Sequence, residues 1–279
     1  MVFSEESQIK SKQKAIDFAT ALGEEADNYT SLLSPHSQLW NAYGAETRNH
    51  LETLITLQAE QIRPLMLSVV KLFTIGEAQK AFRLFVSWSV RFLIAGGGGG
   101  GTMERNYSAR AVSIREGEIT TATDLAKSMA GIIPNDAEFE SAFSTARVSQ
   151  THLARYYLRV LEDQAKGLAE PEYVPNKDQH VINLEHVLPM NPDAEWRHIK
   201  AEDAEAFSKR IGNMALLKAR TNADIGRLGF KDKVTYFKES TYILTSEISS
   251  NHDWTPKEIA ERQKRLASLA VKAWPLKVR

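Results

Sequence analysis

The stretch Asn183-Leu184-Glu185-His186-Val187-Leu188-Pro189 decides how the second half of this chain folds. Across residues 180–187, apolar and polar residues alternate enough to predict a short β-strand. Pro189 lacks a backbone N–H and ends that strand. A second apolar run follows at residues 214–217 and is expected to pair with the first. The pattern therefore predicts two short strands, with a Glu-His pair where the first strand ends.

A well-marked helix closes the chain after these strands. Thr255-Pro256-Lys257-Glu258 supplies a capping hydroxyl, a proline at the first helical position and a glutamate at the third. These are the residues that satisfy or tolerate the free N–H groups of a first helical turn. The buried stripe of this helix is expected to include Ile259, Leu266 and Trp274.

The residues before the strands are expected to be mostly helical, because apolar residues recur there at helical spacing. In the first helix, Ile16, Leu22 and Tyr29 are predicted to face a core. Pro64 is predicted to break or kink the segment 51–73, and the six glycines at 96–101 are expected to form a flexible loop.

Two prolines at residues 170–176 indicate an extended linker. We therefore predict an N-terminal helical domain at residues 1–170 and a second domain at residues 171–279. The fold class is α+β, and mostly α.

Composition excludes several kinds of site. The 279 residues include no cysteine, which rules out disulfides, thiolate metal sites and a cysteine nucleophile. No basic region followed by an apolar core opens the chain, and the apolar stretch 84–95 is too short and polar to span a bilayer. The sequence thus predicts a cytoplasmic protein with no membrane partner.

Charge is unevenly distributed although the formal net charge is zero. Residues 1–60 carry four Lys/Arg against nine Asp/Glu, whereas residues 205–238 carry eight against three. A local basic segment can hold a phosphate backbone even in a neutral chain. The alternative is that the segment is an ordinary solvated helix face.

The Glu-His pair and two asparagines that follow it, nine residues apart, suggest hydrolysis of a phosphodiester. That reaction needs a base for the attacking water and a cation that offsets charge on the phosphate. Mg²⁺ prefers oxygen ligands, and the Glu185 carboxylate and Asn222 carbonyl are reasonable ones, with Mn²⁺ as a substitute cation. Both strand-end side chains can converge on such a site if the strand gives way to a loop there.

Glu185-His186-Val187-Leu188-Pro189, Ile211-Gly212-Asn213-Met214 and Asn222 together resemble the HNH (ββα-metal, or His-Me finger) nuclease motif. More narrowly, residues 175–279 resemble the C-terminal nuclease domain of GmrSD-type restriction endonucleases, which attack modified phage DNA. The resemblance implies a helical domain followed by a small ββα-metal domain with flanking helices.

The resemblance also implies roles for individual residues. His186 would be the general base, and Glu185 and Asn222 would ligate the metal. Asn213 would hold the His186 segment in position. Lys233, and more weakly Arg220 and Lys218, would contact nucleic acid.

Members of that family usually carry an N-terminal domain with an Asp-Gly-Gln-Gln-Arg motif, which this sequence lacks. A sensing domain or partner subunit outside this chain is therefore expected. The leading hypothesis is a metal-dependent endonuclease that nicks or cuts double-stranded DNA, expected to be phage DNA. A homodimer is one way in which such an enzyme would cut both strands. The alternatives are a non-catalytic DNA-binding or interaction module, and a ribonuclease.

Overall fold

The computed structural model describes residues 5–96, 100–167, 182–218, 225–226 and 228–278. Helices dominate these residues, and β1 and β2 form a two-stranded antiparallel sheet, in agreement with the mostly helical α+β class. The elements are α1 (Glu5–Leu32), α2 (Gly44–Thr56), α3 (Arg63–Leu72), α4 (Ile75–Ala95), α5 (Gly100–Arg115), α6 (Ala122–Met129), α7 (Asp136–Phe143), α8 (Thr151–Ala165), β1 (Ile182–His186), α9 (Ala201–Phe207), β2 (Met214–Lys218), α11 (Phe230–Lys238), α12 (Ile243–Ser246) and α13 (Pro256–Ala273).

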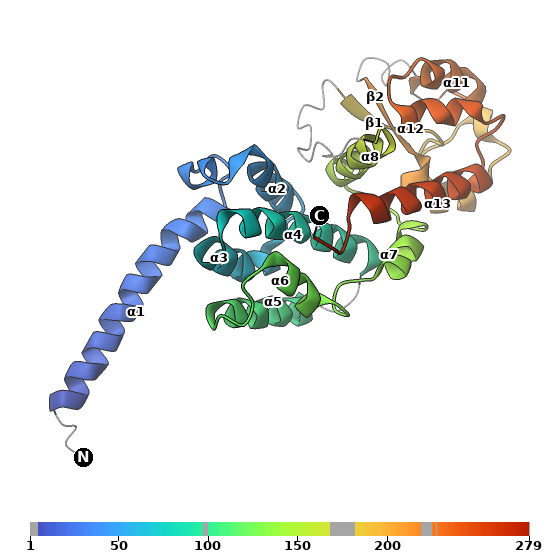
Figure 1. The fold of residues 1–279 in the computed structure, drawn as a ribbon. Helices are drawn as coiled ribbons and strands as arrows, with labels where there is room; N and C mark the ends of the chain where they lie inside the picture. The colour runs from blue at the N-terminus through green and yellow to red at the C-terminus, as the bar shows by residue number, and fades with distance from the viewer. Residues whose placement is uncertain (1–4, 97–99, 168–181, 219–224, 227, 279) are drawn as a thin grey trace.

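Helices α2 to α6 form a helical lobe, and the sheet lies in a second lobe with α8, α11, α12 and α13 (Figure 1). Pro64 lies in the first turn of α3, so the predicted break there is confirmed. Gly96 ends α4 with a positive φ of 65°, which a glycine adopts without a Cβ penalty. Part of the glycine run nevertheless belongs to a helix, since α5 begins at Gly100.

Helix α1 contradicts the prediction that its apolar residues face a core. It projects from the helical lobe and packs against α3 near its C-terminal end (Figure 1). Ile16 is 48% exposed, Leu22 53% and Tyr29 39%. Helical periodicity identifies an apolar face, but it does not say whether anything covers that face.

One large hydrophobic core joins the two lobes. It includes Leu51 and Phe82 of the helical lobe, Leu184 of β1, and Trp274 just after α13. Helix α13 runs from the outer side of the second lobe toward the helical lobe (Figure 1), and the Trp274 ring packs among Phe139, Phe143 and Tyr157. The predicted boundary at residues 170/171 lies outside the described residues and stays a prediction.

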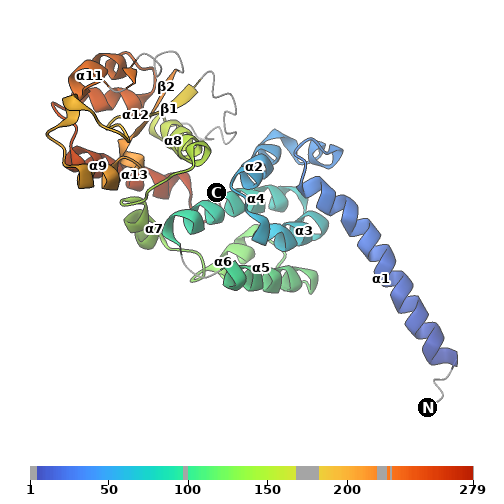
Figure 2. The same cartoon turned by 180° about the vertical axis from the view of Figure 1, so that it is seen from behind.

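The closing helix begins as the sequence predicts. Thr255 is the N-cap of α13, Pro256 starts the helix, and Thr255 and Glu258 form a capping box. Seen from behind, α9 lies beside this helix (Figure 2). Within the described part of the chain, no helix is long and apolar enough to cross a membrane.

Candidate active site

The two strands pair in a register that separates the Glu-His pair. Glu185 pairs with Ala215, and His186 pairs with Met214. Paired residues share a face of the sheet and neighbours along a strand alternate, so the two side chains leave β1 on opposite faces. Ala215 belongs to a second, smaller core beside α11, while Met214 belongs to the large core. Strand β1 includes His186, so no loop begins between Glu185 and His186 that would let both side chains point into one site.

His186 is half-buried at the end of β1. Its surroundings lower the pKa of the imidazole, chiefly through burial and then through the positive charges of Lys233 and Lys209. A lowered pKa favours the neutral ring at neutral pH. Neutral imidazole can accept a proton, as a general base must.

Glu185 lies in a buried ion pair with Lys233 of α11. Its Oε1 accepts a hydrogen bond from Lys233 Nζ at 2.5 Å, and the two side chains are 8% and 0% exposed. Lys233 Nζ also donates to the backbone oxygens of His186 and Val187, each at 3.2 Å. Burial raises the pKa of Glu185 and lowers that of Lys233, and their attraction opposes both shifts.

This position of Lys233 differs from the DNA contact that the sequence analysis expects. The lysine belongs to an amphipathic helix, but its side chain lies on the inner face, where three oxygens accept its hydrogen bonds. A side chain with no exposed surface cannot reach a phosphate in this arrangement.

Asn213 connects four segments of the second lobe and is fully buried. Its Nδ2 donates to the backbone oxygens of Leu188 and Ser208 at 2.8 and 3.0 Å. Its Oδ1 accepts from Leu188 N at 2.8 Å and from Trp254 Nε1 at 2.9 Å. All hydrogen-bonding positions of the amide are therefore used inside the protein, and Asn213 fixes the segment that follows His186.

Two residues of α13 hold the segment before β2, and sequence reasoning does not single them out. Buried Arg262 donates to the backbone oxygens of Gly212 and Met214 at 2.7 and 2.8 Å. Gln263 Oε1 accepts from Gly212 N at 3.2 Å. The available signal is that Arg262 and Gln263 fall on the apolar stripe between Ile259 and Leu266, where polar side chains need internal partners.

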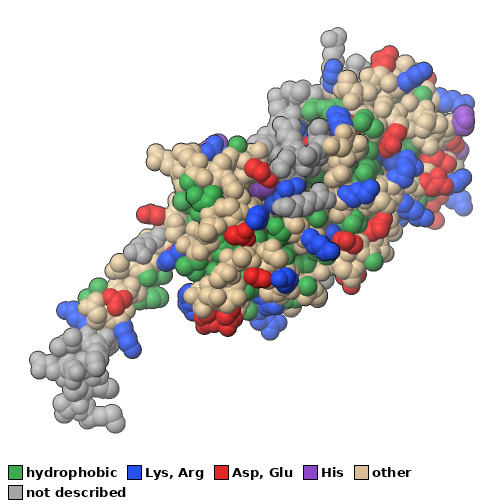
Figure 3. Space-filling view, in the orientation of Figure 1, with side chains coloured by type: hydrophobic (Ala, Val, Ile, Leu, Met, Phe, Trp, Pro, Cys, Tyr) green, Lys and Arg blue, Asp and Glu red, His purple; other side chains and the backbone are tan. Residues whose placement is uncertain are grey.

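Of the three remaining predicted site residues, the structure describes Lys218. Lys218 is exposed at the end of β2, whereas Arg220 and Asn222 lie outside the described residues. Basic and acidic side chains are interspersed over the face shown in Figure 3. Within the described ranges, no three His, Asp or Glu side chains form a cluster able to hold a metal ion.

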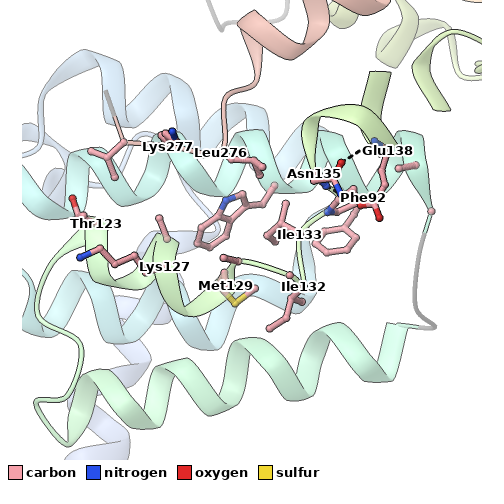
Figure 4. A pocket seen from close by; sticks show the side chains of 18 residues that line it. Phe92, Thr123, Lys127, Met129, Ile132, Ile133, Asn135, Glu138, Leu276 and Lys277 are labelled. Carbon is pink, nitrogen blue, oxygen red and sulfur yellow. Dashed lines mark hydrogen bonds between the residues drawn. The ribbon is translucent and has the colours of Figure 1, made fainter. Parts of the chain in front are cut away.

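A large cavity lies away from the strands. It has a volume of about 960 Å³ and is bounded by α4, α6, the segment before α7 and residues 276–278. Phe92, Met129, Ile133 and Leu276 line it together with Lys127 and Lys277 (Figure 4). Its lining is mainly apolar and includes neither His186 nor Glu185, so it is separate from the Glu-His site.

Residues 133–269 match the family described as GmrSD restriction endonucleases, C-terminal domain. The match begins just before α7 and ends within α13, so it contains the sheet, His186, Asn213 and the Glu185–Lys233 pair. It supports a GmrSD-type restriction endonuclease C-terminal region, for which DNA is the implied substrate. No curated protein matches the chain.

Proposed function

We propose that the region from α7 to α13 is an HNH-type endonuclease that hydrolyses phosphodiester bonds of double-stranded DNA in the restriction of phage. The observation that carries this proposal is the match of residues 133–269 to a restriction endonuclease domain. The matched region presents His186 at a strand end with its neutral form favoured.

His186 is assigned the role of general base. In the proposed reaction its neutral ring nitrogen takes a proton from water as the water oxygen attacks phosphorus. The bond from phosphorus to the departing 3′ oxygen of the sugar then breaks, and that oxygen takes a proton from solvent water. The products expected from the HNH resemblance carry a 5′ phosphate and a 3′ hydroxyl. Asn213 supports this role indirectly, because it binds the backbone of Leu188, two residues beyond the base.

A divalent cation, Mg²⁺ or Mn²⁺, is the cofactor that the HNH resemblance implies. It would offset the charge of the phosphate and of the departing oxygen. The Glu185 carboxylate does not fit such an ion, because it already binds the Lys233 ammonium. The other expected ligand, Asn222, lies outside the described residues and stays a prediction.

A second candidate function is a non-catalytic DNA-binding module within a larger defence protein. The buried Glu185–Lys233 ion pair favours this candidate. The lysine already neutralises the carboxylate, so Glu185 needs no metal ion as a counter-charge. For both candidate functions, we propose that a domain or subunit outside this chain senses the target DNA. For the endonuclease, a homodimer would allow both DNA strands to be cut.

Plasmid nicking separates the two candidates. Supercoiled DNA is incubated with Mg²⁺ or Mn²⁺ and either the wild-type chain, His186→Ala or His252→Ala. His252 is an exposed histidine of the same lobe and serves as the matched control. We expect nicking by the wild type and the control, with at least a hundredfold loss in His186→Ala, the scale of a lost general base.

Equal nicking by all three proteins would reject His186 as the base. DNA binding without nicking by any of them would favour the binding module. Faster cleavage of RNA than of DNA would assign the activity to a ribonuclease instead.

A further inference from the structure

The Lys233 ammonium is surrounded by three oxygens from three consecutive residues. They are Glu185 Oε1 at 2.5 Å and the backbone oxygens of His186 and Val187 at 3.2 Å each. An ammonium has three N–H donors and no acceptor, so these contacts use its full hydrogen-bonding capacity. Lys233 therefore links α11 to the strand end that carries His186.

The charges of the pair balance each other in a dry environment. An ammonium that is 0% exposed is costly to bury unless a carboxylate accompanies it, and Glu185 supplies that carboxylate. A divalent cation at the same carboxylate would have to displace the ammonium or lie close to a like charge. The sheet register also directs Glu185 to the face opposite His186.

The backbone contacts of Lys233 connect the ion pair to His186. One of the two carbonyls belongs to His186 itself, and the other to the next residue. Fixing both limits rotation of the two peptide groups that flank Val187, the first of which directly follows His186. The direction of the imidazole then depends on a lysine that does not need to touch DNA.

We propose that Lys233 is a positioning residue for His186 and that Glu185 is its counter-ion, not a metal ligand. The catalytic part of this inference rests on the proposed function, whereas the counter-ion part does not. It replaces both the DNA contact expected of Lys233 and the metal contact expected of Glu185.

The counter-ion role is tested by Glu185→Gln in the full chain, with Mn²⁺ binding measured by titration calorimetry and unfolding measured by circular dichroism. We expect a lower unfolding midpoint and a Mn²⁺ affinity within twofold of the wild-type value. A tenfold or greater loss of Mn²⁺ affinity, or an unchanged midpoint, would overturn the counter-ion role. A wild-type chain without Mn²⁺ binding would agree with it.

The positioning role is tested by Lys233→Met, by the double variant Glu185→Met with Lys233→Met, and by the control Lys231→Met. Lys231 is exposed on the same helix. We expect the double variant to recover most of the unfolding midpoint lost in Lys233→Met, because the unpaired buried charge is gone. Its kcat for nicking should still be at least tenfold below the wild-type value, with an unchanged KM for DNA.

A structural role alone would restore kcat together with stability, and that outcome would overturn the positioning role. The NMR signal of the His186 ring supplies a readout that needs no activity. It should shift in Lys233→Met and in the double variant, but not in Lys231→Met. An unshifted ring signal in the double variant would also overturn the proposal. If the wild-type chain does not nick DNA, the proposed function is rejected. The NMR signal of the His186 ring then tests the positioning role by itself.

Discussion

At the residue scale, the most constrained polar side chain of the second lobe is Asn213. In the sequence it reads as part of an ordinary Gly-Asn turn before an apolar run. In the structure its side-chain amide hydrogen-bonds to both the backbone N–H and the backbone oxygen of Leu188. It also donates to Ser208 O and accepts from Trp254 Nε1. Its contribution is to fix backbone near His186, since no part of the side chain is exposed.

Replacing Asn213 with alanine is expected to destabilise the protein by at least about 3 kcal/mol, because several buried groups lose their partners at roughly 1–3 kcal/mol each. Urea denaturation followed by circular dichroism measures the change. Asn251→Ala is the control, since Asn251 makes one local side-chain bond to Ile248 O. A loss below about 1 kcal/mol for Asn213→Ala, similar to the control, would contradict the described network.

Sequence alone could indicate Glu185, His186 and Asn213 as important, because they fall within one short conjunction of motifs. It could not indicate that Lys233 meets Glu185, which lies 48 residues earlier. That contact depends on how α11 packs on the sheet, and a helix pattern does not specify the neighbouring surface. The same limit applies to Arg262, which reaches Gly212 across 50 residues.

At the element scale, local sequence signals predict where strands and helices begin and end better than they predict which faces are buried. The strands β1 and β2 and the cap of α13 appear where the sequence predicts them, because turn and capping chemistry acts within a few residues. The prediction that the apolar residues of α1 are buried is wrong, because burial depends on a partner surface. The close packing of α13 against the segment before β2 likewise depends on a partner surface, and its local signals are Gly212 and the polar pair Arg262 and Gln263 on an apolar stripe.

Gly212 is the point of closest approach between that segment and α13. A Cβ built there would lie 2.4 Å from Ile259 O and 2.7 Å from Gln263 Cβ, closer than atoms can pack. Gly212→Ala should therefore destabilise the protein by about 1–3 kcal/mol, the usual cost of overpacking. Thermal unfolding measures it against Gly76→Ala, where a Cβ meets nothing within 4 Å. Equal unfolding midpoints for the two variants would argue against this packing.

At the scale of the whole molecule, the helical lobe and the sheet share one core, and the family match begins at residue 133, before the predicted boundary. Helices α7 and α8 both pack against α13, so the matched region includes elements that the sequence analysis assigned to the first domain. A linker pattern rich in proline marks a change in the chain, but it does not reveal which helices pack across it.

Acid stability of the whole molecule is expected to depend on His50. This side chain is 1% exposed, and burial, followed by the charge of Arg83, lowers its pKa from 6.5 to about 3. Between pH 6.5 and 3, His50 is therefore protonated in the unfolded chain but neutral in the folded chain. The contribution of neutral His50 is complete above pH 6.5 and is lost as pH falls toward 3.

This difference should lower the free energy of unfolding by about 2 kcal/mol at pH 5 relative to pH 8. His50→Gln removes the titrating group and should reduce the pH dependence by that amount, whatever its effect on stability at pH 8. Urea denaturation of both proteins at the two pH values measures it. Parallel pH dependence in wild type and variant would show that His50 does not control acid stability.

The most direct test of the central claim, that His186 is the general base of a DNA endonuclease, is the initial rate of plasmid nicking by His186→Ala with and without imidazole. We expect His186→Ala to nick at least a hundredfold more slowly than wild type and to be partly restored by imidazole, while His252→Ala keeps the wild-type rate. A His186→Ala rate equal to that of wild type, with the same folded fraction of protein, would contradict the claim.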